Sequence, residues 1–545
     1  MNDNENINFK NQNRPQFNFN FQNLKFTVKH KIILSLLVLL ILAFIVFFQM
    51  PVLNPIYKQS LALFFLVIAI FVAIFIKNKT KVVYILAIYF VLMFLIVFLT
   101  SPIFSSQKYY NMLGEIKTYD YETNPPKIDD SLVPVVDEQL AQNLGDKKLG
   151  ENIGLGSQFQ PGEYYLVSTS TDLAWVSPLE PRSFIKWLEN MEGTPGYIYV
   201  SATNPNDVRL VTDNKIKYSK GSYFFNNIRR YAYLHGNLST GLTDFSFEVD
   251  DNLNPYWVIT TYAPSFNIWA GNQATGAVVV NATNGEINKY SLKEDNMPDW
   301  IERVQPTQFL IDQINYWGAY KNGWFNTIFG QKEMIKTTKG YSFVNIDSKP
   351  YLYTGLTSIQ SDESTVGFML VNLRTKESFF YTLNGATETA AMSSAEGQVQ
   401  QYGYSSSFPI LLNIYGEPTY FMPLKDKQGL IKQYAFVSVS NYNIVGIGNS
   451  YSKAKDDYYD KLKSNGSVST NKEDTIELSG KISRINYISD TYYIMIEGNK
   501  ELFTIKDNVS KYLKLTQVGD NVKFSYLKSD DTYKEIVKFN NETLA

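Results

Sequence analysis

The sequence contains no cysteine among its 545 residues and only two histidines, His30 and His235. The absence of cysteine excludes disulfide bridges, thiolate metal sites and cysteine nucleophiles. Two histidines are too few for the usual histidine-rich zinc site. The chain also has no Gly-x-x-x-x-Gly-Lys-Ser/Thr phosphate loop and no Gly-x-Ser-x-Gly nucleophile turn. The sequence therefore predicts no cofactor and favours a protein that is not an enzyme.

Charged residues are missing from three apolar runs, 32–48, 61–76 and 82–99. With their apolar flanks, these runs approach the roughly 20 residues that a helix needs to span a membrane. We predict three transmembrane helices within residues 31–101. The first is not a cleavable signal peptide, because two further spans follow and no small-residue cleavage site comes after it. Ser35 and Tyr84 are too few to build an ion path, so the spans are interpreted as an anchor, or alternatively as a surface that packs on a partner.

The basic residues around these runs predict the orientation of the chain. Five precede the first span and three lie between the second and third, but only one lies between the first and second. In sequence order these residues are Lys10, Arg14, Lys25, Lys29, Lys31, Lys58, Lys77, Lys79 and Lys81. The N-terminus is therefore expected to be cytoplasmic. An odd number of spans then places everything after Ser101 outside the cell membrane.

The part of the chain after the spans is acidic. Nine of the 50 Lys and Arg residues and two of the 52 Asp and Glu residues precede residue 105, which leaves 41 basic and 50 acidic residues after it. Binding to nucleic acid depends on a basic face that neutralises phosphates. The sequence therefore argues against a nucleic-acid partner.

Two polar segments flank the spans. Residues 1–30 are rich in Asn, Gln and Phe, with few aliphatic side chains, and are predicted to be a disordered cytoplasmic tail. Residues 102–135 are interpreted as a helix and a tether, because 118–132 is polar and contains proline. The folded part is expected to start at residue 136.

A pattern of β-forming residues that end in a polar turn recurs in residues 136–463. It occupies 196–204, 276–284, 367–375 and 434–442, and an extended segment precedes the last three, at 255–262, 350–357 and 418–423. Helical periodicity accompanies the pattern at 182–192, 306–320, 386–401 and 452–462. The sequence thus predicts an extracytoplasmic α+β domain of repeated antiparallel β-hairpins, each with a helix.

These hairpin-plus-helix units resemble PepSY-type modules. The closest likeness is 255–258 followed by 276–287, which includes Thr283, Gly285 and Glu286 in a turn. A second likeness is 445–448 followed by a helix with Ala454 and Tyr458, whereas 367–377 departs from the pattern by lacking the turn glycine. Residues 160–462 also resemble multi-span membrane proteins of Gram-positive bacteria. The resemblance implies small extracytoplasmic domains that bind or inhibit peptidases or serve envelope regulation.

A separate domain is expected at the C-terminus. A polar linker, 464–474, precedes short strands at 476–485, 492–497, 501–505 and 521–526. This spacing predicts a small β-barrel of OB-like or SH3-like type in residues 475–545. The domain contains balanced numbers of acidic and basic residues, so we expect an accessory barrel that packs on a partner or on the main domain, and not on nucleic acid.

Two groups of side chains are candidates for a site. Residues 243–251 read as a strand that places Asp244, Glu248 and Asp250 on one face, which suggests either a weak Ca²⁺ site or a solvated acidic face. An aromatic cluster suggests either a binding platform or core packing. This cluster consists of Tyr316, Trp317, Tyr320 and Trp324.

The sequence favours a non-enzymatic binding or scaffold protein of the bacterial cell envelope, anchored in the membrane, whose PepSY-like modules face an envelope or membrane protein partner. One alternative is an accessory subunit of a transport or secretion complex. The other is a carboxylate-dependent hydrolase of cell-wall polymer or peptide, which a pocket with two buried, converging acids would favour.

Overall fold

A computed structural model of the chain describes residues 27–76, 79–126, 128, 134–168, 173–266, 270–294, 296–346, 349–359, 364–465, 475–488, 491–506, 509–510, 512–527 and 533–544. Most of the predicted tail and most of the predicted linker lie outside these residues. The described residues form a mixed α+β fold that divides into two compact units, Met1–Tyr458 and Tyr459–Ala545. The helix α12 (Tyr451–Ser464) crosses the boundary between the units.

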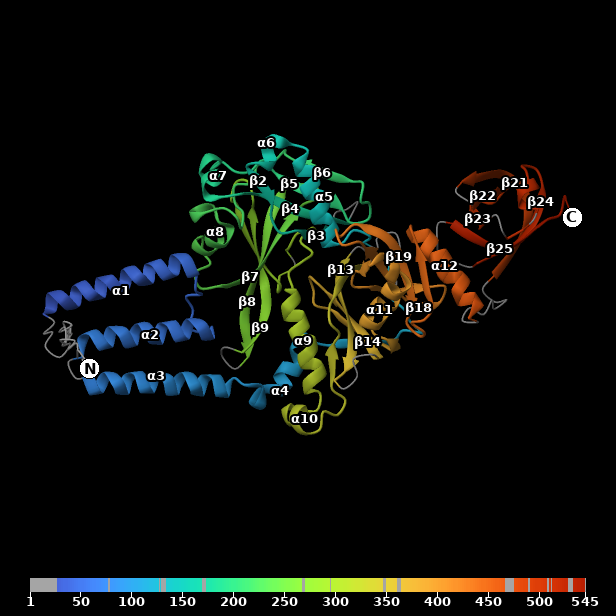
Figure 1. Ribbon diagram of the computed structural model, residues 1–545. Coiled ribbons are helices and arrows are strands. Elements are labelled where there is room, and N and C mark those ends of the chain that lie inside the picture. The colour runs from blue at the N-terminus through green and yellow to red at the C-terminus, as the bar shows by residue number, and fades with distance from the viewer. Residues whose placement is uncertain are drawn as a thin grey trace, which may run out of the picture. The chain divides into compact units, whose positions relative to one another are not determined.

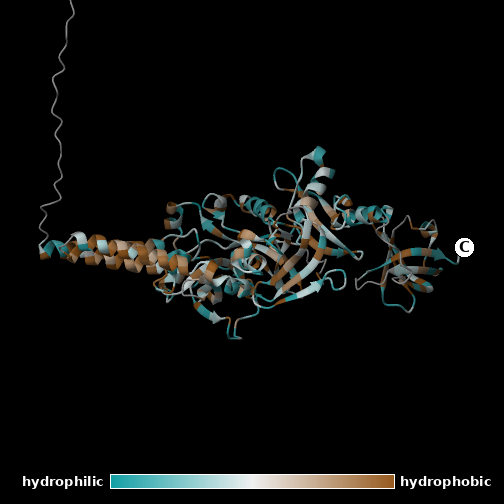
Figure 2. Cartoon of the chain, turned by 90° about the horizontal axis from the view of Figure 1, so that it is seen from below, coloured by the Kyte–Doolittle hydropathy of each residue, from teal (hydrophilic) through white to brown (hydrophobic). Residues whose placement is uncertain are grey.

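The first unit begins with the apolar helices α1 (Val28–Gln49), α2 (Lys58–Phe75) and α3 (Lys79–Leu99) (Figure 1). Two helices are long and apolar enough to cross a membrane, Val28–Gln49 and one that begins at Thr80, whereas the apolar stretch Lys58–Val72 is shorter. Hydrophobic residues dominate these helices along their length (Figure 2). A helix that is apolar all round needs an apolar environment. The described structure thus contains two candidate membrane helices where the sequence predicts three spans.

The loop between α1 and α2 is hydrogen-bonded to the folded domain. The Tyr57 hydroxyl donates to the carbonyl of Tyr262 at 2.6 Å and accepts from the backbone N–H of Gly241 at 2.9 Å. The N–H of Leu53 donates to the carbonyl of Leu238 at 2.6 Å. The end of α1 and the start of α2 therefore lie against the α+β domain.

The chain after α3 packs against the same domain. The helix α4 (Pro102–Tyr110) places the Tyr109 ring 4.9 Å from the ring of Phe266 and 4.8 Å from that of Tyr316. A short 3-10 helix, η2 (Asn111–Leu113), buries Leu113 in the core of a sheet that contains β13 (Lys349–Ser358) and β14 (Ser364–Asn372). The strand β1 (Ile116–Asp120) then pairs in parallel with β15 (Ser378–Ala386) of that sheet. Residues 118–120 of the expected tether are thus part of a sheet.

The domain is built from four modules that share one order of elements, a helix followed by an antiparallel meander. Module 1 contains α5 (Glu138–Gly150), α6 (Ile153–Gly156), β2 (Phe159–Pro161), β3 (Tyr165–Ser168), β4 (Leu173–Pro181), α7 (Phe184–Glu189), β5 (Tyr197–Ser201) and β6 (Val208–Val211). Module 2 contains α8 (Ile228–Leu234), β7 (Gly241–Val249), β8 (Pro255–Phe266), β9 (Ala270–Asn281) and β10 (Ile287–Ser291).

Module 3 contains α9 (Thr307–Tyr320), α10 (Trp324–Phe329), β11 (Ile335–Thr337), β12 (Ser342–Ile346), β13 (Lys349–Ser358), β14 (Ser364–Asn372) and β15 (Ser378–Ala386). Module 4 contains α11 (Glu388–Gln398), the 3-10 helix η5 (Gln400–Tyr402), β16 (Ser405–Ser406), β17 (Ile410–Ile414), β18 (Glu417–Lys425), β19 (Ile431–Ser438) and β20 (Val445–Gly448). The first strand of the meander is continuous in module 2, as β7, and is split into two short strands in the other three modules.

The recurring sequence pattern marks the same turn in every module. The strands β5, β9, β14 and β19 end on a Ser or Asn whose side-chain oxygen accepts backbone N–H groups of the turn that follows. These residues are Ser201, Asn281, Asn372 and Ser438. The predicted strand pairs β8–β9, β13–β14 and β18–β19 are confirmed as antiparallel neighbours.

The residue after this turn-forming side chain links the helix of each module to its sheet. Its carbonyl accepts from the N–H groups of one or two residues shortly before the helix of that module, at distances between 2.7 and 3.1 Å. The accepting residues are Ala202, Ala282, Leu373 and Val439. The four modules therefore repeat in hydrogen bonding more regularly than in sequence.

The helices pack on their sheets through apolar faces that the sequence pattern only partly reveals. Leu310 and Ile314 of α9 join Leu352 and Met369 in one core, as the periodicity of 306–320 predicts. The predicted helices at 386–401 and 452–462 are confirmed as α11 and α12, and the helix predicted at 182–192 is the shorter α7. The helices α5 and α8 have no counterpart in the sequence prediction.

The second unit contains a closed five-stranded barrel in the order β21-β22-β23-β25-β24. Its strands are β21 (Thr475–Ile488), β22 (Thr491–Ile496), β23 (Leu502–Lys506), β24 (Asn521–Leu527) and β25 (Tyr533–Asn541). The β23–β25 pair is parallel, and the 3-10 helix η7 (Leu513–Leu515) comes between β23 and β24 in sequence. The predicted small barrel is confirmed, with one strand, β25, beyond the four that the sequence indicates.

Candidate binding cleft between the second and third modules

The strand predicted to carry an acidic face is β7. The apolar side chains on its other face point into the core, as the alternation in the sequence predicts. Phe245, Phe247 and Val249 belong to or pack against the core that modules 1 and 2 share. Asp244 interrupts the alternation, because it forms a bulge between Thr243 and Phe245 and has a positive φ of 45°. The alternation of side chains therefore holds only after Asp244.

The opposite face of β7 is buried and not solvated. Ser246 and Glu248 are 2% and 4% exposed. The segment before α9 packs on this side of the sheet, where Ile301 and Val304 join the core that includes Val258. The prediction of a solvated acidic face is therefore wrong, since a connecting segment far along the chain covers it.

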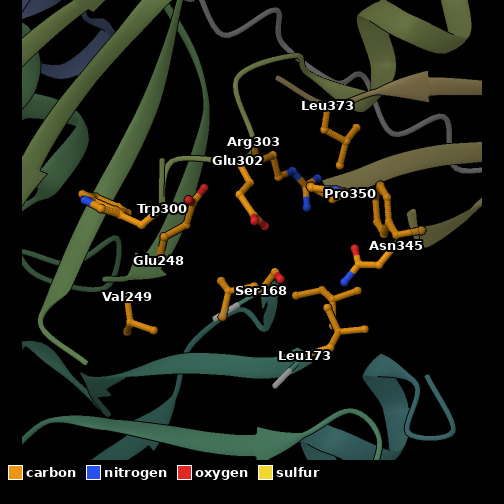
Figure 3. A pocket seen from close by; sticks show the side chains of 13 residues that line it. Ser168, Leu173, Glu248, Val249, Trp300, Glu302, Arg303, Asn345, Pro350 and Leu373 are labelled. Carbon is orange, nitrogen blue, oxygen red and sulfur yellow. The ribbon is translucent and has the colours of Figure 1, made fainter. Parts of the chain in front are cut away.

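Two acids converge on a small cavity at this junction. Glu248, Glu302 and Arg303 line a cavity of about 30 Å³ together with residues of modules 1 and 3, and their side chains come together in Figure 3. The Ser246 hydroxyl is close enough to the Glu248 carboxyl group to lower its pKa, and beyond this neighbour Oε1 of Glu248 has no hydrogen-bond partner among the described residues. A cavity of this size has room for about two water molecules, which can hydrogen-bond the polar side chains of its lining, Glu248 among them.

Burial sets the protonation of both acids. It raises the pKa of Glu248 to about 8, against the opposing effect of the Arg303 charge. It also raises the pKa of Glu302 to about 8, with Arg374 as the opposing charge. Both carboxyl groups are therefore mostly neutral at pH 7.

An open cleft of about 440 Å³ adjoins the other side of Arg303. Its walls are the bulge of β7, the first turn of α9 and the β11–β12 turn, and its lining is rich in hydroxyl groups. The lining residues are Thr243, Asp244, Arg303, Pro306, Thr307, Gln308, Ile311, Thr337, Thr338, Gly340 and Tyr341. The cleft thus lies between modules 2 and 3.

Arg303 is the residue common to the cavity and the cleft. Its guanidinium donates to Oγ1 of Thr307 at 3.2 Å, lies 3.8 Å from the Asp244 carboxylate and is 5.0 Å from the centre of the Phe343 ring. The helix α9, which starts here, has no side-chain cap and no acidic residue in its first turn. The cleft therefore offers hydrogen-bond donors and acceptors and one cation, which suit a polar ligand such as a peptide segment.

The three acids proposed as a weak Ca²⁺ site have different surroundings. Asp244 is near Arg303, and Glu248 faces the cavity. Asp250 instead forms a turn, since its Oδ1 accepts the N–H groups of Asn252 and Asn254 at 2.9 Å each. Among the described residues, no group of three His, Cys, Asp or Glu side chains is placed to hold a metal ion.

Three members of the predicted aromatic platform contact other parts of the same chain. The rings of Tyr316 and Tyr320 stack at 6.0 Å, and both contact Tyr109 of α4. Trp317 packs on Phe380 of β15 at 5.4 Å.

Trp324 starts the next helix, α10, and packs on Phe325 at 5.2 Å. Phe325, Ile328 and Phe329 of this helix are 64%, 53% and 81% exposed. The four aromatic residues therefore lie in three places. Tyr316 and Tyr320 contact α4, Trp317 contacts the sheet of module 3, and Trp324 lies on α10.

Arg303 and Glu302 are absent from the sequence-based candidates. Their role depends on the packing of residues 297–304 on module 2, which no local pattern indicates. The one available signal is their position just before Pro306, which the sequence identifies as a helix start.

Comparisons with known proteins do not extend this description. No family model matches the chain, and no curated protein matches it significantly. Among solved structures, a crystal structure of a mutant B. megaterium levansucrase aligns with 10% sequence identity over 78% of this chain and 96% of that one. Its TM-score of 0.20 is too low to support an argument about fold or function.

Proposed function

We propose that this chain is a membrane-anchored, extracytoplasmic binding protein of the bacterial cell envelope. Its four modules, which resemble PepSY-type modules, are presented to a protein partner. The cleft beside Arg303 is the proposed site for a polypeptide segment of that partner. The OB-like barrel at the C-terminus is an accessory domain.

The observation that carries the anchoring is the docking of the loop between α1 and α2, and of the segment after α3, on one domain. These contacts require α1 and α3 to end, and α2 to begin, on the side of that domain. The 18 residues of α2 rise about 27 Å, close to the ~30 Å of a bilayer core, so we count it as a third span.

The charges at the opposite ends of the helices support the orientation. Lys29 and Lys31 lie at the start of α1, and Lys79 and Lys81 at the start of α3. Positive residues are favoured on the cytoplasmic side. The modules are therefore proposed to face the outside of the cell.

The nature of the cleft supports a polypeptide ligand. The strand β1 already adds to the edge of the third sheet in parallel, with Ile116 opposite Ser378, so an extended segment can be recruited by a module of this type. Such binding uses main-chain hydrogen bonds for affinity and side-chain pockets for specificity. The cleft supplies both donors and acceptors next to the first strand of module 2.

Site-specific photo-crosslinking on intact cells tests this proposal. A photo-reactive amino acid replaces Gln308 in the cleft, and the matched control replaces Gln142 of α5. Both glutamines are exposed, and each donates a hydrogen bond to an acid four residues away, Asp312 and Glu138 respectively. We expect a specific protein adduct from position 308 and none from position 142. No adduct at 308, or the same adducts at both positions, would contradict a partner in the cleft.

A specific observation also favours hydrolysis as a second candidate function, because Glu248 and Glu302 converge on one cavity. Acid–base catalysis by two carboxyl groups usually needs environments that separate their pKa values. Here burial raises both to about 8, and the cavity is too small for a polymer. Binding is therefore the function that the geometry supports better. Loss of a hydrolytic activity in a Glu302→Gln variant would reverse this ranking.

A further inference from the structure

An exposed apolar patch lies on α7 and the 3-10 helix η4 (Phe224–Asn226), and the cleft makes no use of it. We define the apolar patch by six side chains that are between 40% and 61% exposed. They are Phe184, Ile185, Leu188, Met191, Phe224 and Phe225. Contiguous exposed apolar patches often mark contacts with proteins or membranes, whereas single exposed apolar residues are common on any protein surface.

The apolar patch is held in place by the chain itself. The Phe184 and Phe224 rings are 6.2 Å apart, and Nδ2 of Asn226 donates to the carbonyl of Met191 at 3.2 Å. Phe224 has a positive φ of 46°, which is rare for a bulky residue. The Arg230 guanidinium fixes this turn by donating to the Phe224 carbonyl at 2.7 Å. A turn that is fixed by hydrogen bonds, and not a flexible segment, therefore exposes the aromatic rings.

The apolar patch is continuous with the end of α1. The Phe225 ring packs on that of Phe47 at 5.6 Å. Arg230 donates from Nε to the Phe47 carbonyl at 2.9 Å, and its guanidinium lies 4.4 Å from the Phe47 ring centre. Phe47 belongs to the last turn of α1, and Phe225 of the patch contacts it, so the patch adjoins the end of this apolar helix. In Figure 1 the helices α7 and α8 (Ile228–Leu234) lie near this end of α1.

We infer that the apolar patch lies in the interfacial layer of the bilayer that α1 spans, with its aromatic and aliphatic side chains among lipid headgroups and upper acyl chains. This inference rests on the membrane anchoring proposed above. Aromatic side chains favour this layer, and short amphipathic elements bind it through their apolar faces. Two exposed basic residues, Arg182 before the patch and Arg229 after it, flank the patch in sequence, and basic residues near a membrane surface are attracted to anionic headgroups. The membrane contact would fix the orientation of modules 1 and 2 on the bilayer.

The absence of cysteine makes a direct test possible. Single cysteines replace Ile185 and Leu188 in the full-length chain, which are 58% and 45% exposed and can be replaced without opening a core. Each is labelled with an environment-sensitive fluorophore after reconstitution into phosphatidylcholine and phosphatidylglycerol vesicles. The control in water is Ile153→Cys on α6, where the side chain is 89% exposed, and the control in lipid is Phe94→Cys on α3.

The expected result is loss of fluorescence at positions 185 and 188 with lipids brominated near the headgroup, together with protection from iodide in the solvent. Position 153 should respond to iodide only, and position 94 to deeply brominated lipid.

If position 94 responds to lipid while 185 and 188 behave like 153, the inference about the patch fails and the anchoring stands. Protection from iodide without quenching by lipid would mean that protein covers the patch, which also overturns the inference. If position 94 itself does not respond to lipid, the proposed anchoring fails and this inference fails with it.

Discussion

At the residue scale, the junction of modules 2 and 3 contains acids whose neutral form is favoured in the folded state. Glu248 is 4% exposed, its Oε1 has no partner among the described residues beyond the Ser246 hydroxyl, and burial raises its pKa to about 8. An acid whose pKa is raised on folding binds its proton more tightly in the native state than in the unfolded one. Between about pH 4.5 and pH 8, the free energy of unfolding therefore falls as the pH rises.

Replacing Glu248 by Gln should remove the part of this pH dependence that Glu248 contributes. A neutral amide keeps the shape of the side chain and cannot ionise, so Glu248→Gln should raise the free energy of unfolding at pH 8 by on the order of 2–4 kcal/mol. At pH 4, where the native and unfolded carboxyl groups are both protonated, the variant should gain little. Thermal unfolding of the detergent-solubilised chain at both pH values measures the difference. Glu192→Gln, at an exposed glutamate, is the control, and an equal effect in both variants would argue against burial as the cause.

Single residues also mark the limit of prediction from sequence. The alternation in β7 correctly predicts that Phe245, Phe247 and Val249 face the core. It does not predict that Arg303 lies beside Asp244, because that contact joins two modules. Asp250 is different, since its place shortly before Asn252 and Asn254 is a local turn signal that favours a capping role over a metal ligand.

At the scale of elements, local patterns predict the hairpins well and the added strand not at all. The pairs β8–β9, β13–β14 and β18–β19 join neighbouring segments with β-forming residues, so a short window of sequence contains them. The parallel pairing of β1 with β15 joins residues more than 250 positions apart and leaves no local trace. The sequence does not predict the helix α5, because its buried face contains only two large apolar side chains, Leu140 and Leu149, beside Ala141 and Gly145.

The loop between α1 and α2 provides a prediction at this scale. Tyr57→Phe removes the hydroxyl that bridges Tyr262 and Gly241, which leaves a backbone carbonyl and N–H without that partner. An unpaired buried polar group costs about 1–3 kcal/mol. We expect a lower melting temperature and faster proteolysis of the loop in detergent micelles. Tyr84→Phe, at an exposed tyrosine of α3, should change neither, and a Tyr57→Phe variant as stable as this control would show that the loop is not docked.

At the scale of the whole molecule, the contacts between the four modules and the apolar helices support the proposed membrane topology. The repeated meander was predictable because each copy carries the same strand and turn pattern, whereas the cleft was not, because it exists only where modules 2 and 3 meet. The two sides of the proposed membrane follow from the contacts at the ends of the helices. The loop at Tyr57 and the helix α4 touch the modules, and Lys31 and Lys81 lie at the opposite ends of α1 and α3.

Labelling of single cysteines on intact cells tests this topology most directly. Ile153→Cys lies on the first module, where the side chain is 89% exposed, and Lys81→Cys lies near the start of α3. A membrane-impermeant maleimide should label position 153 on intact cells and position 81 only after the cells are opened. Labelling of position 81 on intact cells, or protection of position 153 until the cells are opened, would contradict a membrane-anchored domain that faces outward.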